Sequence, residues 1–169
     1  MEMYTGKSIF KGIAIGKILF YQKGEQPVKR MKIEDTAEQI KRYEDARAKA
    51  AEQLQGLYEK ALKEVGEANA AVFEVHQMML EDEDYQDAIL GMIRNEEVNA
   101  EYAVHEAGIH FAEMFSAMDD EYFRARAADI RDISQRLVGI LTDEGAENVS
   151  WDEPMIVVAP DLVPSETVQ

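Results

Sequence analysis

The stretch Glu67–Tyr85, EANAAVFEVHQMMLEDEDY, decides how the rest of the chain is interpreted. It combines apolar residues with a dense group of acids, and it contains no Lys or Arg. The apolar residues are Val72, Phe73, Met78, Met79 and Tyr85, and the acids are Glu67, Glu74, Glu81, Asp82, Glu83 and Asp84. Methionine adapts to irregular surfaces and complementary charge guides association, so the stretch predicts a surface for a basic partner with an apolar centre. The alternative is a helix with a core stripe and a solvated acidic end.

Helical periodicity surrounds this stretch. Apolar residues recur every three or four positions over Ile33–Val65, which predicts one long amphipathic helix that ends at Gly66. A second helix starts at Glu67 and continues to Arg94. We expect a kink or break in it near Glu81–Glu83, because adjacent carboxylates repel one another in a continuous helix.

Two further helices follow in the sequence. Asn99 is a candidate N-cap for a helix over Ala100–Met118, and Asp119 or Asp120 can cap the next one. Short connections between four helices predict an antiparallel bundle, which we assign to residues 33–143.

Both ends of the chain have strand character. Ser8–Tyr21, SIFKGIAIGKILFY, has glycines among β-branched and aromatic residues, and Met155–Ala159, MIVVA, is typical of a buried strand. Pro164-Ser165-Glu166 is a typical opening of a helix. We therefore expect residues 1–32 and 144–169 to be parts of an incomplete α/β domain into which the bundle is inserted. The predicted fold class is α+β, mainly α.

Composition limits the functions that the chain can have. The 169 residues carry a net charge of -16, which argues against nucleic acid as a partner because phosphates would repel it. Without cysteine, the chain has no disulfides and no thiolate chemistry. Nothing resembles a signal peptide, and no segment is long enough to span a bilayer, so a cytoplasmic protein without membrane contact is expected.

Metal and nucleophile chemistry are poorly supported by the sequence. Di-iron bundles need Glu-x-x-His pairs, and no histidine here has a glutamate three positions before it. Asp82-Glu83-Asp84 lacks the glycine of an EF-hand loop. His76 is interpreted as a hydrogen-bonded structural or interface residue, with a nucleophile as the weaker hypothesis.

Four segments resemble one family in the family's own order. They are KGIAIGK (Lys11–Lys17), FEVHQMMLEDEDY (Phe73–Tyr85), RARAADIRDISQRL (Arg124–Leu137) and VVAPDLVPSET (Val157–Thr167). Together they resemble the N-terminal part of enzyme I of the phosphoenolpyruvate:sugar phosphotransferase system, or phosphoenolpyruvate-protein phosphotransferase.

The resemblance implies a helical subdomain that docks HPr, the histidine-containing phosphocarrier, inside an α/β phosphohistidine domain. The family transfers phosphoryl from phosphoenolpyruvate through a histidine to HPr for sugar uptake. Its accepting histidine lies in a Gly-Gly-x-x-x-His segment, which is expected about twenty residues beyond this chain, so the chain alone is expected to be inactive. Mg²⁺ and homodimer formation are implied for the full-length enzyme, and no cofactor for this chain.

The resemblance also implies partner-binding residues. These are Glu67, Ala71, Glu74, His76, Met78, Met79, Asp82, Asp84, Tyr85 and Arg126. Met78, Met79 and Tyr85 would form the apolar centre, and the acids a complementary rim. Arg126 is expected to approach the acidic segment, either bracing a carboxylate or contacting the carrier directly.

Departures from the family pattern keep alternatives open. Phe10-Lys11-Gly12 replaces part of the usual Ser-Pro-Gly, Met79 and Tyr85 stand where leucines are common, and Ala68 stands where an acid is common. One alternative is an acidic helical adaptor without a part in phosphoryl transfer. Another is an enzyme I-like segment of a different multidomain phosphotransferase, such as those of dihydroxyacetone kinases.

Overall fold

The computed structural model describes residues 12–20, 27–142, 155–159 and 162. They fall into two compact units, a helical unit described over residues 27–142 and a strand unit described over residues 12–20 and 155–159. The predicted mainly helical α+β fold is confirmed. The predicted domain boundaries, 1–32 with 144–169 and 33–143, stay a prediction.

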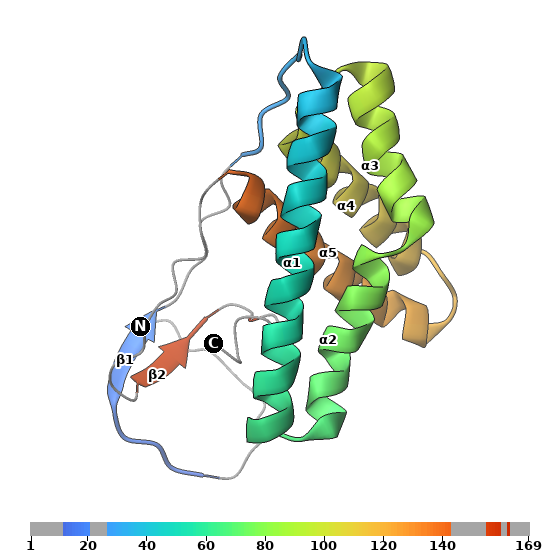
Figure 1. The fold of residues 1–169 in the computed structure, drawn as a ribbon. Helices are drawn as coiled ribbons and strands as arrows, with labels where there is room; N and C mark the ends of the chain where they lie inside the picture. The colour runs from blue at the N-terminus through green and yellow to red at the C-terminus, as the bar shows by residue number, and fades with distance from the viewer. Residues whose placement is uncertain (1–11, 21–26, 143–154, 160–161, 163–169) are drawn as a thin grey trace, which may run out of the picture. The chain divides into compact units, whose positions relative to one another are not determined.

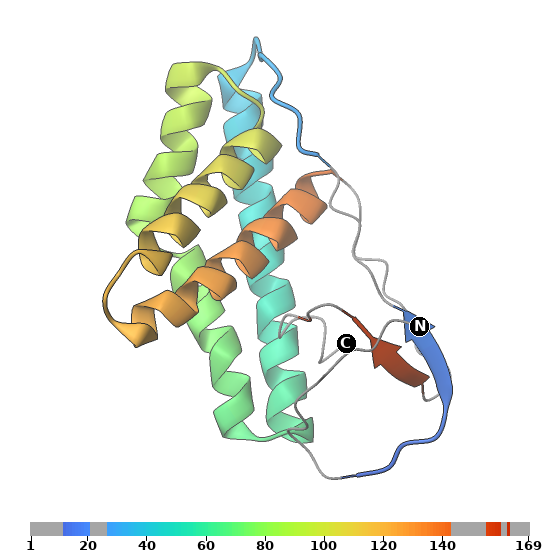
Figure 2. The same cartoon turned by 180° about the vertical axis from the view of Figure 1, so that it is seen from behind.

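The helical unit contains five helices (Figure 1). They are α1 (Thr36–Glu64), α2 (Glu67–Leu80), α3 (Glu83–Glu96), α4 (Ala100–Ser116) and α5 (Glu121–Leu141). α2 and α3 follow one another alongside the long α1, and α4 and α5 pack as a pair behind them (Figures 1 and 2). The four predicted helices are therefore present, with the second one divided into α2 and α3.

The predicted break lies between Leu80 and Glu83, and the structure gives it a more specific cause than repulsion. Asp82 is the N-cap of α3, where its Oδ1 accepts a hydrogen bond from the backbone N–H of Tyr85 at 3.0 Å. Glu81 forms an ion pair with Arg47 of α1 at 2.9 Å. The acids thus end one helix and start the next, as side-chain caps commonly do.

Glycine is required where α1 turns into α2. Gly66 is the N-cap of α2 and has a φ of 89°, a conformation that L side chains rarely adopt. The turn lets α2 run back along α1, and the two pack closely. The core formed by the five helices contains mainly Ala, Leu, Ile and aromatic residues, with Tyr43, Leu54, Phe73, Tyr85, Ile89, Ile93, Ile130 and Leu137 among its largest members.

The strand unit contains β1 (Lys17–Phe20) and β2 (Met155–Val158), which pair in parallel with Lys17 opposite Met155. The predicted strands are confirmed in these two segments. The prediction of a buried strand is wrong for β2 as described, because Val157 and Val158 are 36% and 43% exposed. Within the described residues β1 is its one neighbour in the sheet, so one side of the ladder is uncovered. The predicted helix opening at Pro164 lies outside the described residues.

A buried polar network connects the two ends of the described helical unit. Asn99 is the N-cap residue of α4, as predicted, but its side chain makes no capping hydrogen bond. Its side chain instead accepts a hydrogen bond from the N–H of Met31 at 2.8 Å and donates to the carbonyl of Lys29 at 3.2 Å and to Glu101 at 3.1 Å. Arg42 of α1 donates to Glu101 and to the carbonyl of Leu141 at 2.9 Å. The segment that leads into α1 and the end of α5 are therefore held by the same side chains.

We expect this network to make stability depend on acid pH through Glu101. Burial raises the pKa of Glu101, but hydrogen bonds from Arg42 and Asn99 outweigh it and hold the pKa below the usual 4.5. Because the pKa of Glu101 is lower in the folded than in the unfolded state, its ionised form stabilises the fold. This stabilisation is fully present above the pKa of the unfolded state, and it is lost as the pH falls through the pKa of the folded state. Glu101→Gln should lower the free energy of unfolding by about 1.5–3 kcal/mol at neutral pH. In urea unfolding curves, this difference from the wild type should shrink below pH 4.5.

The exposed Glu113 on the same helix provides the control, and Glu113→Gln should follow the wild type across the pH range. If the loss of unfolding free energy in Glu101→Gln stayed constant into strong acid, the ionised Glu101 would not be the source of the pH dependence.

Candidate protein-docking face

One face of α2 carries four of the predicted site residues. Glu67, Ala71, Glu74 and Met78 are separated by four, three and four positions, which places them in one row along a helix. Both glutamates are exposed, Ala71 is half-buried, and Met78 is 74% exposed. We call these four residues the α2 stripe. An exposed methionine beside acids fits one part of the predicted surface, and its role in binding stays a prediction.

The acids of the α2 stripe lie near one point on α1. The carboxylate of Glu74 raises the pKa of the Tyr58 phenol, with burial and then Glu67 as smaller causes. Tyr58 is partly buried against the core. Its hydroxyl therefore stays protonated beside two carboxylates, and the negative potential of the stripe extends to the edge of α1.

Asp82 and Asp84 continue the acidic surface beyond the end of α2. Both are exposed, and both lie at the N-terminus of α3, where negative charge favours the helix dipole. Asp82 also caps the helix, so a substitution there changes folding as well as surface charge.

Tyr85 lies in the core, against the prediction that it belongs to the exposed apolar centre. It is 1% exposed and packs edge-on against Phe111 with ring centroids 5.5 Å apart. Its hydroxyl is 2.8 Å from Ser134 Oγ, and burial raises the pKa of the phenol above its usual range. Met79 is also partly buried against the core. Of the three residues predicted to form the apolar centre, Met78 is the exposed one.

His76 is buried as well and cannot touch a partner directly. Its exposed fraction is 0%, and its Nε2 lies 3.1 Å from Asp129 Oδ1 of α5. Its Nδ1 lies 3.8 Å from Asp132 Oδ2. The interpretation of His76 as a hydrogen-bonded residue fits these distances, and its role is internal.

Arg126 contacts its own helix rather than the acidic segment. Its Nη1 donates to Asp129 Oδ2 at 2.7 Å, and its guanidinium lies 4.8 Å above the ring centroid of Tyr122. The prediction that Arg126 braces a carboxylate of the acidic segment is thus corrected, because Arg126 bonds instead to the carboxylate that also holds His76. Arg126 reaches Asp129 because the two residues are three positions apart on the same helix, where side chains are neighbours. A direct contact of Arg126 with the carrier stays a prediction.

Aromatic residues gather at the connection between α4 and α5, and the sequence did not single them out as site residues. Phe115 and Phe123 stack with an interplanar angle of 4°, and Tyr122 packs edge-on against Phe123. Tyr122 and Phe123 are 59% and 42% exposed. We call Phe115, Tyr122 and Phe123 the aromatic cluster. The start of α5 lies beside α2 in both views (Figures 1 and 2). The sequence signal that could have identified this cluster is the presence of aromatic residues on both sides of Asp119-Asp120.

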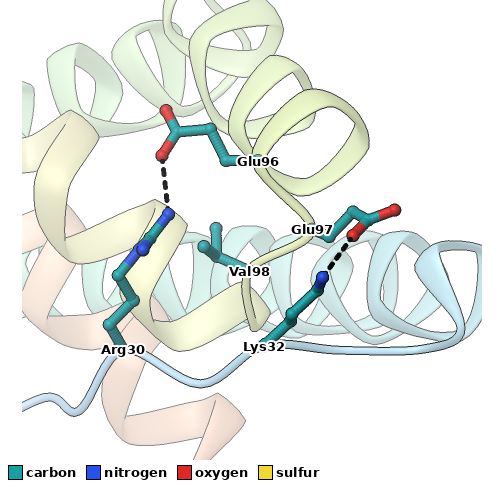
Figure 3. Close-up of a pocket in the computed structure, with 5 residues that line it drawn as sticks. All are labelled: Arg30, Lys32, Glu96, Glu97 and Val98. Carbon is teal, nitrogen blue, oxygen red and sulfur yellow. Dashed lines mark hydrogen bonds and ion pairs between the residues drawn. The ribbon is translucent and has the colours of Figure 1, made fainter.

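The pocket at the other end of the unit offers no comparable site. Arg30, Lys32, Glu96, Glu97 and Val98 line a space of about 470 Å³ (Figure 3). Arg30 pairs with Glu96 at 3.3 Å and Lys32 with Glu97 at 3.4 Å, so the charges that line it satisfy one another. Within residues 12–20, 27–142, 155–159 and 162, no cluster of His, Asp or Glu is arranged to hold a metal, and no helix is long and apolar enough to cross a membrane.

The fold is that of the N-terminal domain of enzyme I. An NMR solution structure of the Enzyme I protein nEIt matches with a TM-score of 0.75 and 32% identity over 90% of this chain and 63% of that one. The N-terminal domain of Enzyme 1 - Nitrogen matches with a TM-score of 0.71 and 28% identity over 93% of this chain and 65% of that one. The chain belongs to the family of PEP-utilising enzymes, whose N-terminal region is matched by residues 5–126.

Relatives that carry the name phosphoenolpyruvate-protein phosphotransferase match along nearly the whole chain. The Bacillus subtilis protein is 36% identical over 100% of this chain and 30% of its own length. The Geobacillus stearothermophilus protein is 38% identical over 97% of this chain and 28% of its own length. The Enterococcus faecalis protein is 39% identical over 99% of this chain and 30% of its own length. The chain thus spans less than a third of the length of these relatives.

Proposed function

We propose that the helical unit docks HPr, as the N-terminal part of a phosphoenolpyruvate-protein phosphotransferase. The observation that carries the proposal is Met78, an apolar side chain that is 74% exposed beside the acids of the α2 stripe. As the resemblance implies, the carrier presents an apolar patch near its histidine with basic residues around it. The α2 stripe complements that surface in both polarity and charge.

The two kinds of residue contribute differently to docking. Buried apolar anchors carry most of the affinity of an interface, whereas charges at its rim act on the association rate and its salt dependence. Met78 is the anchor in this proposal, and Glu67, Glu74 and Asp84 form the rim. The aromatic cluster offers further exposed apolar surface at the start of α5.

We expect Met78→Ala to weaken HPr binding by about 1–2 kcal/mol, because it removes the exposed anchor. Since Met78 is outside the core, the free energy of unfolding should change by less than about 0.5 kcal/mol. Isothermal titration calorimetry with HPr measures the affinity. Met31→Ala is the matched control, because Met31 is a 54% exposed methionine before the start of α1. Equal affinities of the two variants would place the docking face elsewhere.

Glu74→Lys should slow association and reduce its salt dependence, because it reverses a rim charge without removing a helix cap. Stopped-flow association rates at low and high salt measure this effect. Glu74 is a better test than Asp82, whose replacement also removes the N-cap of α3. Glu34→Lys, an equal charge change on an exposed residue before α1, provides the control. If both variants changed the rate equally, net charge alone would explain the steering.

The remaining parts of the proposal concern the whole phosphotransferase. The 169 residues contain no Gly-Gly-x-x-x-His segment, so the isolated chain is expected to form no phospho-HPr from phosphoenolpyruvate and Mg²⁺. The Mg²⁺ requirement, a homodimer and a cytoplasmic location belong to the full-length protein in this proposal. An acidic helical adaptor remains the alternative function, and it predicts that HPr does not bind at all.

A further inference from the structure

We propose that His76 is a positioning residue for the docking face, and that it acts by fixing α2 against α5 through Asp129. This inference rests on the proposed function, since it concerns the same surface. His76 itself does not touch the partner, because its side chain is 1% exposed.

The position of His76 on α2 supports this role. His76 lies two residues from both Glu74 and Met78, and residues two apart point to nearly opposite sides of a helix. The docking stripe therefore faces solvent while the imidazole faces the interior. A bond on the inner side of α2 sets the rotation of the helix, and hence where Met78 and Glu74 point.

The partner of His76 is itself held firmly. Asp129 Oδ1 meets His76 Nε2 at 3.1 Å, while its Oδ2 accepts from Arg126 at 2.7 Å. Arg126 in turn lies over the ring of Tyr122 in the aromatic cluster. One carboxylate thus connects the inner side of α2 to the part of α5 that carries the exposed aromatic residues.

A second set of contacts extends the network to α1. Asp132 lies near the other ring nitrogen of His76, and its charge acts on Arg136, which donates to Gln53 of α1 at 2.7 Å. A hydrogen bond between buried polar groups has a required geometry, whereas apolar contacts tolerate sliding. The bond between His76 and Asp129 therefore specifies one arrangement of α2 and α5.

The test uses two amides that differ in reach. The amide nitrogen of Gln can take the place of His Nε2 and donate to Asp129, whereas that of Asn reaches only as far as Nδ1. In calorimetric titrations with HPr, His76→Gln should stay within about threefold of the wild-type affinity, and His76→Asn should lose tenfold or more. His76→Leu, which fills the space without a donor, should resemble His76→Asn.

A second measurement reports the helix arrangement directly. The chain contains no cysteine, so Ala68→Cys on α2 and Ala128→Cys on α5 allow two spin labels at exposed positions. The label distance distribution should match the wild type in His76→Gln and shift or broaden in His76→Asn. Ile93→Val, which trims the core in α3, is the control for lost stability and should leave both affinity and distance unchanged.

The outcomes separate this inference from the proposed function. Equal affinity of wild type, His76→Gln and His76→Asn would overturn the positioning role. Equal loss in the two amide variants, with an unchanged label distance, would overturn it too. Failure of the wild type to bind HPr would instead overturn the proposed function, and the label distances would then decide whether His76 sets the arrangement of α2 and α5.

Discussion

Gly108→Ala is expected to destabilise the helical unit by about 2 kcal/mol or more, although alanine favours helices over glycine. A Cβ at position 108 of α4 would lie 2.3 Å from Ser134 Oγ and 2.5 Å from Ser134 Cβ of α5. Rotation of the serine cannot relieve the second contact, because a Cβ is fixed by its own backbone. The two helices would have to separate, which opens the surrounding core.

Ser134 is also held in place by its own hydrogen bonds. Its Oγ donates to the carbonyl of Ile130 at 2.7 Å and lies 2.8 Å from the hydroxyl of Tyr85. The new methyl group would therefore disturb three helices at once. Thermal unfolding followed by circular dichroism should show a lower melting temperature by about 5–10 °C.

Gly56→Ala is the matched control and should have the opposite sign. Gly56 lies inside α1, and a Cβ there would meet no atom within 4 Å. The substitution should stabilise the unit by about 0.5–1 kcal/mol, because glycine loses more backbone entropy on folding. A Gly108→Ala variant as stable as Gly56→Ala would show that α4 and α5 pack less closely than described.

Tyr85→Ala should lower the free energy of unfolding by about 3–5 kcal/mol, which is the usual cost of truncating a buried aromatic residue. The ring is 1% exposed, and its loss would leave a cavity next to Phe111. Chemical denaturation with urea measures the effect. Any loss of HPr binding in this variant should follow the unfolded fraction rather than a missing contact.

Tyr85→Phe separates the ring from the hydroxyl. It should cost about 1 kcal/mol, because one hydrogen bond is lost while Ser134 still donates to Ile130. If Tyr85→Ala kept the stability of the wild type but lost HPr binding, Tyr85 would be a contact residue and its burial would be refuted.

Tyr85 also shows where sequence reasoning fails. Met78 and Tyr85 are seven residues apart, which in a continuous helix places them on the same face. The break between α2 and α3 restarts the helix with Asp82 as its cap, so the phase changes and Tyr85 turns into the core. The sequence predicted the break correctly, but the new phase depends on the geometry of the connection.

Local signals were otherwise reliable. Asp120 caps α5 as predicted and accepts from the N–H of Tyr122 at 2.8 Å. Periodicity placed the four helical segments within a few residues of their ends. Pairs that are distant in sequence could not be predicted, because nothing local marks them. His76 meets Asp129 across 53 positions, and Gly108 meets Ser134 only because α4 and α5 fold onto each other.

The network around Arg42 has a consequence for protein engineering. Because Asn99, Glu101 and Arg42 bind both the Lys29–Met31 segment and the carbonyl of Leu141, the two places where the chain enters and leaves the five helices are close together. Segments with neighbouring ends tolerate transfer into a foreign loop and circular permutation. We therefore expect residues 27–142 to tolerate transfer into a foreign loop. A short connector between the old ends should also allow new ends to be opened at the turn after Ser116, at the far end of α4.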